Sequence, residues 1–198
     1  GWTGGFLDLR GVAYDGGHGE SGPLIAGNQL FGTKVAPGWS KGETLSDPRR
    51  EPFGPLPADW AKWKGLYLNG EKTVLSYTVG GSAVLETPAL EANAKAISRT
   101  FQLAPFAAAS SMVVSDLPRG VGTVNDGFVT LSGDGKQLFA TLIGAPAGVT
   151  LAVDGERILM KVSAGVTGVF KLVMAHDVAA LTGAALAVDP TLLTKGGP

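Results

Sequence analysis

Two runs of strand-forming residues around a turn signal decide the fold: Gly65-Leu66-Tyr67-Leu68, then Asn69-Gly70, then Thr73-Val74-Leu75-Ser76-Tyr77-Thr78-Val79. An Asn-Gly pair between apolar and β-branched runs is the strongest short-range signal for a β-hairpin, because both residues tolerate the positive φ of a tight turn. A third run, residues 83–87, follows Gly80-Gly81 and is expected to end at Pro88. Together the three runs predict an antiparallel meander.

The next run alternates along residues 97–103 and places Ile97, Arg99, Phe101 and Leu103 on one face of a strand. Arg99 is the odd member of this apolar face. It is interpreted as a strand-end or snorkelling residue, or as the buried partner of a carboxylate.

Two more hairpins are expected in the last third of the chain, each around an Asp-Gly turn. They join residues 128–131 to 138–143 and residues 149–153 to 157–162. One further strand is expected over residues 166–175, and residues 178–188 form a short helix or turn. We therefore predict an all-β fold, an antiparallel β-sandwich or barrel-like sheet pair of about nine to eleven strands with little helix.

Composition agrees with one β-rich domain over residues 1–198, with a loop-rich, aromatic part at 1–60 and a hairpin-rich part at 64–175. The 198 residues are 44% hydrophobic and 17% charged, and 30 glycines and 12 prolines favour many turns. The glycine-rich opening, which has neither a basic start nor a long apolar stretch, suggests a piece excised from a longer protein. The protein is then either cytosolic, or the leader of its precursor is missing from this sequence.

Charge and cysteine content exclude several classes of function. The 16 basic and 17 acidic residues are scattered, so we expect no nucleic-acid partner, and no apolar run is long enough for membrane insertion. The chain has no cysteine and therefore cannot hold haem covalently through a CxxCH motif. Phosphate-binding glycine loops and a Gly-x-Ser-x-Gly elbow are also missing from the sequence, which argues against nucleotide use and serine-hydrolase chemistry.

The densest polar cluster is Tyr14-Asp15-Gly16-Gly17-His18-Gly19-Glu20. Asp15, His18 and Glu20 are candidates for acid or base catalysis or for holding a divalent cation, although the spacing matches no standard metal motif and a structural turn is the simpler interpretation. The second histidine, His176, precedes Asp177 at a strand end. This pair is either structural or a catalytic partner of His18.

Aromatic residues concentrate in the first 70 positions. Trp39, Trp60, Trp63 and Tyr67 are candidate ligand-binding residues, because the apolar C–H faces of sugars stack on flat rings. The alternative is that they seal the core. The spacing of Trp60 and Trp63 would also place both on one side of a helical turn.

Five stretches together resemble an uncharacterised domain of large exported bacterial proteins. These proteins also carry a glucose/sorbosone-dehydrogenase-like β-propeller and a cytochrome c module. The stretches are Trp2 to Gly11, Gly54-Pro55-Leu56-Pro57, Gly65 to Gly70, Leu75 to Gly80 and Val84-Leu85-Glu86. The resemblance covers roughly residues 1–103. It implies a periplasmic or extracellular setting and a link to sugar oxidation or polysaccharide use.

These observations lead us to expect a noncatalytic module of an exported multidomain protein, which binds carbohydrate or docks a neighbouring domain of the same polypeptide. A sugar-active enzyme domain that uses the Asp15, His18 and Glu20 loop is the first alternative, and a purely structural interaction domain is the second. The exposure of Trp39, Trp60 and Trp63 separates them: open coplanar rings favour sugar binding, a shared flat patch favours docking, and buried rings favour the core.

Overall fold

The fold is described from a computed structural model of the whole chain. It describes residues 7–10, 23–27, 31–50, 54–70, 72–91, 95–182 and 187–193. The chain divides into two compact units, residues 1–32 and residues 33–198.

The unit formed by residues 1–32 contains a two-stranded antiparallel ribbon. Its strands are β1 (Leu7–Asp8) and β2 (Leu24–Ile25). Leu7, Leu9 and Leu24 are exposed, and the Asp8 carboxylate accepts hydrogen bonds from the backbone and guanidinium of Arg10.

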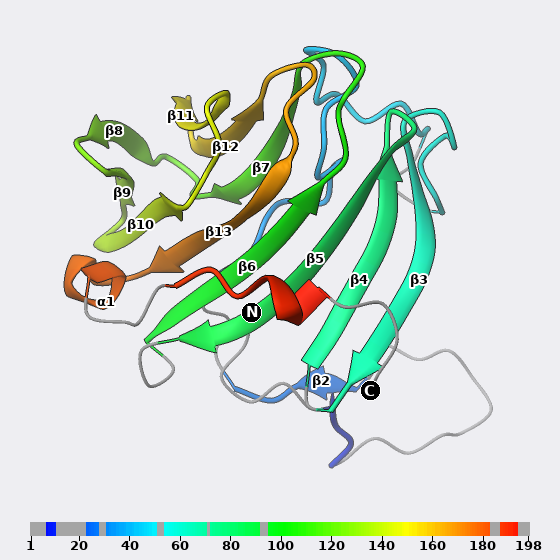
Figure 1. Cartoon of the computed structure of the whole chain (residues 1–198). Coiled ribbons are helices and arrows are strands. Elements are labelled where there is room, and N and C mark those ends of the chain that lie inside the picture. Colours follow the sequence, from blue (N-terminus) through cyan, green and yellow to red (C-terminus); the bar gives the residue numbers. More distant parts are fainter. Residues whose placement is uncertain are drawn as a thin grey trace. The chain divides into compact units, whose positions relative to one another are not determined.

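In the second unit, the described residues form eleven strands, most of which are labelled in Figure 1. They are β3 (Ala61–Asn69), β4 (Lys72–Val79), β5 (Ser82–Glu91), β6 (Ala96–Leu103), β7 (Ser110–Asp116), β8 (Val121–Asn125), β9 (Phe128–Gly133), β10 (Lys136–Ile143), β11 (Val149–Asp154), β12 (Arg157–Val162) and β13 (Gly168–Ala175). A short helix, α1 (Val178–Thr182), and a 3₁₀ turn, η1 (Pro190–Leu193), follow.

All strand pairs are antiparallel, and the strands of this unit form two sheets. The large sheet has eight strands in the order β3-β4-β5-β6-β13-β10-β9-β8, and the small sheet has three in the order β11-β12-β7. The predicted all-β fold is confirmed. Its arrangement is sandwich-like, because side chains of the two sheets meet in one core.

The core lies between the small sheet and one face of the large sheet, which we call the inner face. Phe101 and Phe170 stack there with ring centroids 5.5 Å apart, and Met112, Ile158 and Met160 of the small sheet are fully buried with them. Burial of these five side chains contributes about 1.5–3 kcal/mol each to folding.

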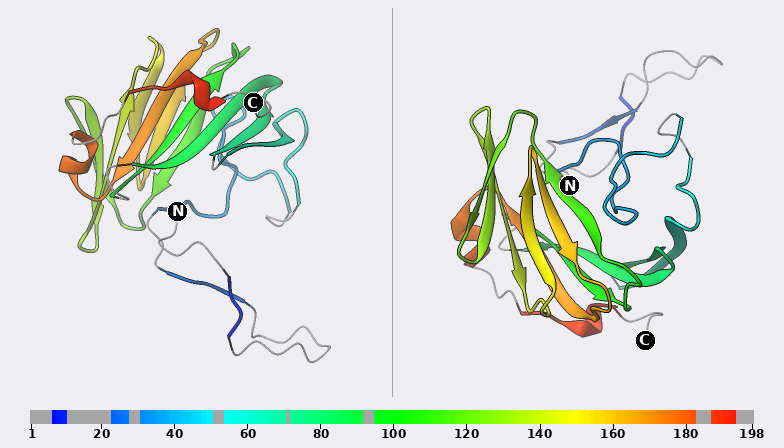
Figure 2. Two further views of the ribbon diagram at one scale, coloured as in Figure 1. Left: turned by 60° about the horizontal axis from the view of Figure 1, so that its bottom comes forward. Right: turned by 90° about the horizontal axis from the view of Figure 1, so that it is seen from above.

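Two C-terminal segments cover parts of the outer face of the large sheet. Val74, Leu85 and Leu193 cluster beneath η1, and Ala180 and Leu181 of α1 pack on Val173 and its neighbours. Figure 1 shows η1 crossing in front of the strands. The two views in Figure 2 show the strong curvature of the sheet, with η1 and residues 33–60 on opposite sides of it.

The predicted hairpins are confirmed, with longer strands than expected. Two of the turns lie one residue later than predicted, because Asn69 and Asp154 are still paired in their strands. β3 and β4 extend to the pair Asn69 and Lys72, and the Asp134-Gly135 turn has positive φ at both residues, as a type I′ turn requires. The spacing of Trp60 and Trp63 predicts a helical turn, and this prediction is wrong. Trp60 is the last residue of a turn, and β3 begins at Ala61.

The sequence predicts that the strand ends at Pro88, but β5 continues to Glu91. The bond from the Ala104 N–H to the Ala83 carbonyl makes Pro88 and Arg99 a non-hydrogen-bonded pair, since such pairs alternate. The nitrogen of Pro88 therefore points toward β4. Pairing with β4 stops at Leu75 and Glu86. The sheet therefore loses no backbone hydrogen bond through the missing N–H of Pro88.

Candidate functional site

Part of the inner face of the large sheet is open. At its β3 edge, Trp63, Leu66 and Leu68 are 57%, 52% and 67% exposed, and Leu90 on β5 is 64% exposed. Strand pairing places them on one face: Trp63 faces Tyr77, Leu66 faces Leu75, and Leu90 faces the inner-face residue Ile97. We call the four exposed side chains, Trp63, Leu66, Leu68 and Leu90, the β3–β5 apolar face.

A β-bulge in β3 decides which side chains belong to this face. Trp63 pairs with Tyr77 but Gly65 pairs with Ser76, so Lys64 is the extra residue. Gly65 has φ +131°, a conformation that glycine adopts without strain. Trp63 and Tyr67 would share a face in a regular strand, but the bulge turns Tyr67 to the outer face, against the cluster beneath η1.

Trp39 and Trp60, the other two predicted ligand-binding aromatics, are only 6% and 4% exposed. The Trp60 indole N–H donates to the Trp39 carbonyl at 2.8 Å, and Trp39 stacks on Phe106 with centroids 5.6 Å apart. Their burial favours the core interpretation for these two rings. The four predicted aromatics do not form one platform.

A chain of polar side chains lies on the same inner face, beside the apolar residues, and connects β4, β5 and β6. The Trp39 indole N–H donates to the Tyr77 hydroxyl at 3.3 Å, and that hydroxyl donates to Glu86 at 2.8 Å. Glu86 also accepts two bonds from Arg99, at 2.6 Å from Nε and 3.0 Å from Nη2. The alternative in which Arg99 is the partner of a carboxylate is therefore confirmed.

Burial and charge act in opposite directions along this chain. Burial raises the pKa of Tyr77, and the Glu86 carboxylate raises it further, so the phenol stays protonated. For Arg99 burial lowers the pKa, but the charge and hydrogen bonds of Glu86 outweigh it and raise the pKa overall. The cluster is a neutral hydrogen donor next to a charged pair. Its hydrogen bonds join side chains of three neighbouring strands, β4, β5 and β6.

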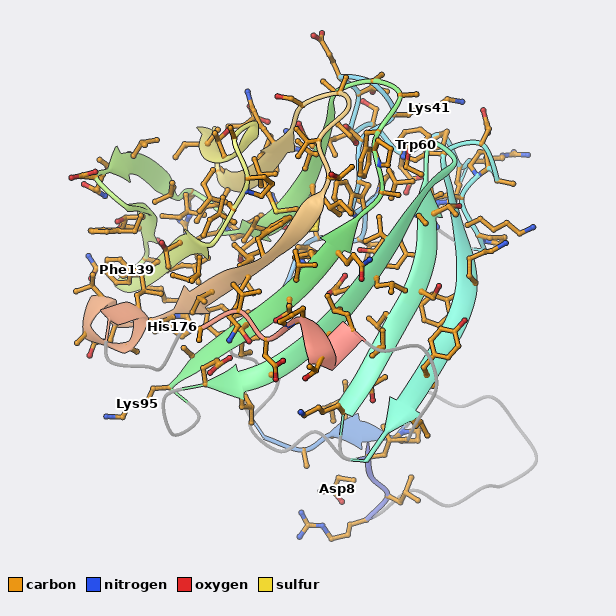
Figure 3. The ribbon with its side chains drawn as sticks, viewed as in Figure 1. Asp8, Lys41, Trp60, Lys95, Phe139 and His176 are labelled. Carbon is orange, nitrogen blue, oxygen red and sulfur yellow. The ribbon has the colours of Figure 1, made fainter. Side chains whose placement is uncertain are left out.

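His176 and Asp177 lie where β13 ends, and each contacts backbone. The His176 ring Nδ1 is 2.7 Å from the Gln137 carbonyl, and the Asp177 carboxylate accepts from the Ala179 N–H at the start of α1. Figure 3 shows His176 at the opposite end of the large sheet from Lys41 and Trp60. These contacts agree with a structural role for the pair.

Asp15, His18 and Glu20 lie outside the described residues, so their roles in catalysis or metal binding stay predictions. Among the residues that are described, no three His, Asp or Glu side chains gather closely enough to hold a metal ion. The chain has no cysteine and so cannot hold haem covalently.

Sequence reasoning missed Leu66, Leu68, Leu90 and Glu86 as members of a site. The spacing of Leu66 and Leu68 does show that they share a face. A glycine inside the strand pattern, Gly65, is the signal that could have located the bulge.

Comparison with known proteins gives one partial match. Residues 1–86 match the model of a family described as a domain of unknown function, DUF6797. No curated protein matches the chain. In the described part of the chain, no helix has the length and apolar character needed to cross a lipid bilayer.

Proposed function

We propose that this chain is a noncatalytic docking module, which binds a neighbouring folded domain of the same polypeptide through the β3–β5 apolar face. The observation that carries the proposal is the exposure of one tryptophan and three leucines, each more than half exposed, on a single sheet face. Exposed apolar surface gathered on one face of a soluble protein often marks a binding site. Tryptophan at the edge of a leucine-rich patch is also typical of protein interfaces.

The apolar face suits a protein partner better than a sugar. Trp63 is the one ring that is more than half exposed on this face among the described residues, and the other exposed side chains of the face are leucines, which offer no hydrogen bonds to sugar hydroxyls. A folded domain that presents its own apolar surface would cover all four side chains.

The edge of the sheet directs the partner onto the face. Lys62 and Lys64 are exposed on β3, and the bulge at Lys64 interrupts the regular edge. Lysines and bulges are the features by which edge strands avoid pairing with another strand. The partner is therefore expected to pack on the side chains of β3 and β5 rather than to extend the sheet.

Two further observations support an occupant from the same polypeptide. The resemblance to exported proteins with propeller and cytochrome modules implies a multidomain, extracytoplasmic setting. The family match over residues 1–86 includes Trp63, Leu66 and Leu68, so three of the four residues belong to the part that matches.

The test uses the natural polypeptide at its full length and exploits the lack of cysteine in this chain. A single cysteine is introduced as Leu66→Cys, labelled with a photoreactive maleimide and irradiated, and the cross-linked peptides are identified by mass spectrometry. Val121→Cys is the matched control, because Val121 is an exposed apolar residue at the other edge of the large sheet.

We expect intramolecular cross-links from position 66 to a neighbouring domain and none from position 121. Cross-links only between copies of this chain would refute the proposal, as would a natural polypeptide with no other folded domain. Replacement of Leu66 and Leu68 by aspartate should abolish the docking while the melting temperature of the isolated chain changes little, because both side chains are exposed.

A further inference from the structure

A cleft of about 730 Å³ lies on the small sheet, on the side that faces away from the core. Its floor is formed by β7, β11 and β12, and the loop at residues 42–46 forms one wall. None of its lining residues belongs to the β3–β5 apolar face. The cleft is therefore a separate feature from the proposed docking surface.

The strand register arranges the floor in rows. Ser111, Lys161 and Thr150 lie side by side across the three strands, and the next row contains Leu159 beside Ala152. Leu159 lies on this outward side and lines the cleft, with 5% of its surface exposed. The floor therefore presents mainly hydroxyls and an amine.

The polar groups of the cleft are largely unused by the protein. Within the described residues, no hydrogen bond or ion pair is made by the side chains of Glu43, Lys161, Thr150 or Ser163, or by the Ser111 hydroxyl. Hydroxyls both donate and accept, Lys161 donates and Glu43 accepts. Such a set suits a ligand that carries many hydroxyl groups.

The charges of the cleft cancel. Arg157 forms an ion pair with Asp154, so among the described lining residues Lys161 and Glu43 are the charged side chains without an ion pair. Lys161 would attract an anionic ligand, but Glu43 would repel it. Glu43 would attract a cationic ligand, but Lys161 would repel it. A neutral ligand is favoured.

The volume and the shape of the cleft suit an extended molecule. A cleft of about 730 Å³ lies within the usual range for ligand sites. A smaller pocket of about 190 Å³ adjoins it and shares Gly42, Ala109 and Ser110 with it. Trp60 and Phe106 line this second pocket, so an apolar wall continues the path.

We infer that this cleft binds a neutral oligosaccharide, with Glu43 and Lys161 as hydrogen-bonding partners of its hydroxyls. The pair is placed on two different elements, the 42–46 loop and β12, and so can hold a sugar between them. The inference concerns binding alone and is independent of the docking proposal.

The experiment titrates the purified chain, labelled with ¹⁵N, with maltopentaose, cellopentaose, xylopentaose and chitopentaose. Amide chemical shifts locate the site, and calorimetry gives the affinity. We expect at least one saccharide to shift amides of residues 42–46, 110–111 and 159–163. Glu43→Gln and Lys161→Met should each weaken the binding of that saccharide about tenfold, which is the effect of losing a charge-assisted hydrogen bond.

Lys136→Met is the matched control, because Lys136 is an exposed lysine of the other sheet, and it should leave the affinity within about twofold. All three positions are exposed, so the melting temperature should stay the same. The inference is overturned if no saccharide shifts the cleft amides, or if binding is unchanged in both cleft variants. Shifts centred on Trp63 would overturn it as well.

Discussion

The buried pair of Glu86 and Arg99 allows a sharp test of what holds the inner face together. The Glu86 side chain is 7% exposed and that of Arg99 is 23% exposed, and two hydrogen bonds join them. Arg99→Met would leave the carboxylate buried with the Tyr77 hydroxyl as its one remaining hydrogen-bond donor among the described residues. Breaking a buried pair in this way costs about 3–5 kcal/mol of unfolding free energy, since the remaining charge is uncompensated.

The loss should be largely reversed by removing the second charge. In the double variant Glu86→Leu with Arg99→Met, no charge is left in the core, so at least half of the lost stability is expected to return. Tyr77 loses its acceptor in this variant, at a cost of about 1–3 kcal/mol, which explains why the recovery is incomplete.

Urea unfolding followed by tryptophan fluorescence measures these differences, because Trp39 and Trp60 are buried. The corresponding fall in melting temperature is roughly 6–20 °C for Arg99→Met in a chain of this size. A single variant that costs less than about 1 kcal/mol would refute the reasoning. A double variant as unstable as the single one would refute it too.

Three further predictions concern close packing and titration. Gly122→Ala would place a Cβ 2.3 Å from a side chain of β11 and should lower the unfolding free energy in urea by about 1–3 kcal/mol. Gly38 has open space around it, so Gly38→Ala should change the unfolding free energy by less than about 0.5 kcal/mol. Equal losses in the two variants would contradict the packing argument. The backbone N–H of Arg119 lowers the pKa of Glu156 in the folded state. The stability that ionised Glu156 contributes is therefore present at neutral pH and is lost as pH falls through the acid range. A melting temperature that stays constant from pH 6 to about pH 3 would contradict this. Burial raises the pKa of Tyr77, so stability should decline as pH rises above about 10, where the unfolded phenol ionises, and Tyr77→Phe should flatten that decline in melting curves recorded from about pH 8 to 11.

Hairpins could be predicted from the sequence because their signals are local. Gly70 and Asp134-Gly135 supply the positive φ of tight turns, and the runs on either side alternate correctly. The face of β6 that carries Arg99 could be predicted for the same reason. Its partner Glu86 could not, because pairing across strands depends on register, which no local pattern gives.

The candidate site was predicted less well, since it depends on one extra residue. A period of two would place Trp63 and Tyr67 together, but the bulge at Lys64 shifts every later side chain of β3 to the other face. Trp39 and Trp60 were predicted to be ligand-binding from their type alone. Their burial depends on the packing of the 33–60 segment against β4 and β7, which is a tertiary effect.

The order of strands in the large sheet has a consequence for synthesis on the ribosome. β6 and β13 are neighbours at the centre of the sheet, although residues 96–103 and 168–175 are far apart along the chain. Local hairpins such as β3–β4 can form as soon as they emerge, but β6 has no partner on its second side until β13 has been made. During that interval the nascent chain carries an unprotected strand with Ile97 and Phe101 on it. Slow translation between these two segments would lengthen this exposure, and a holding chaperone would have its longest task there.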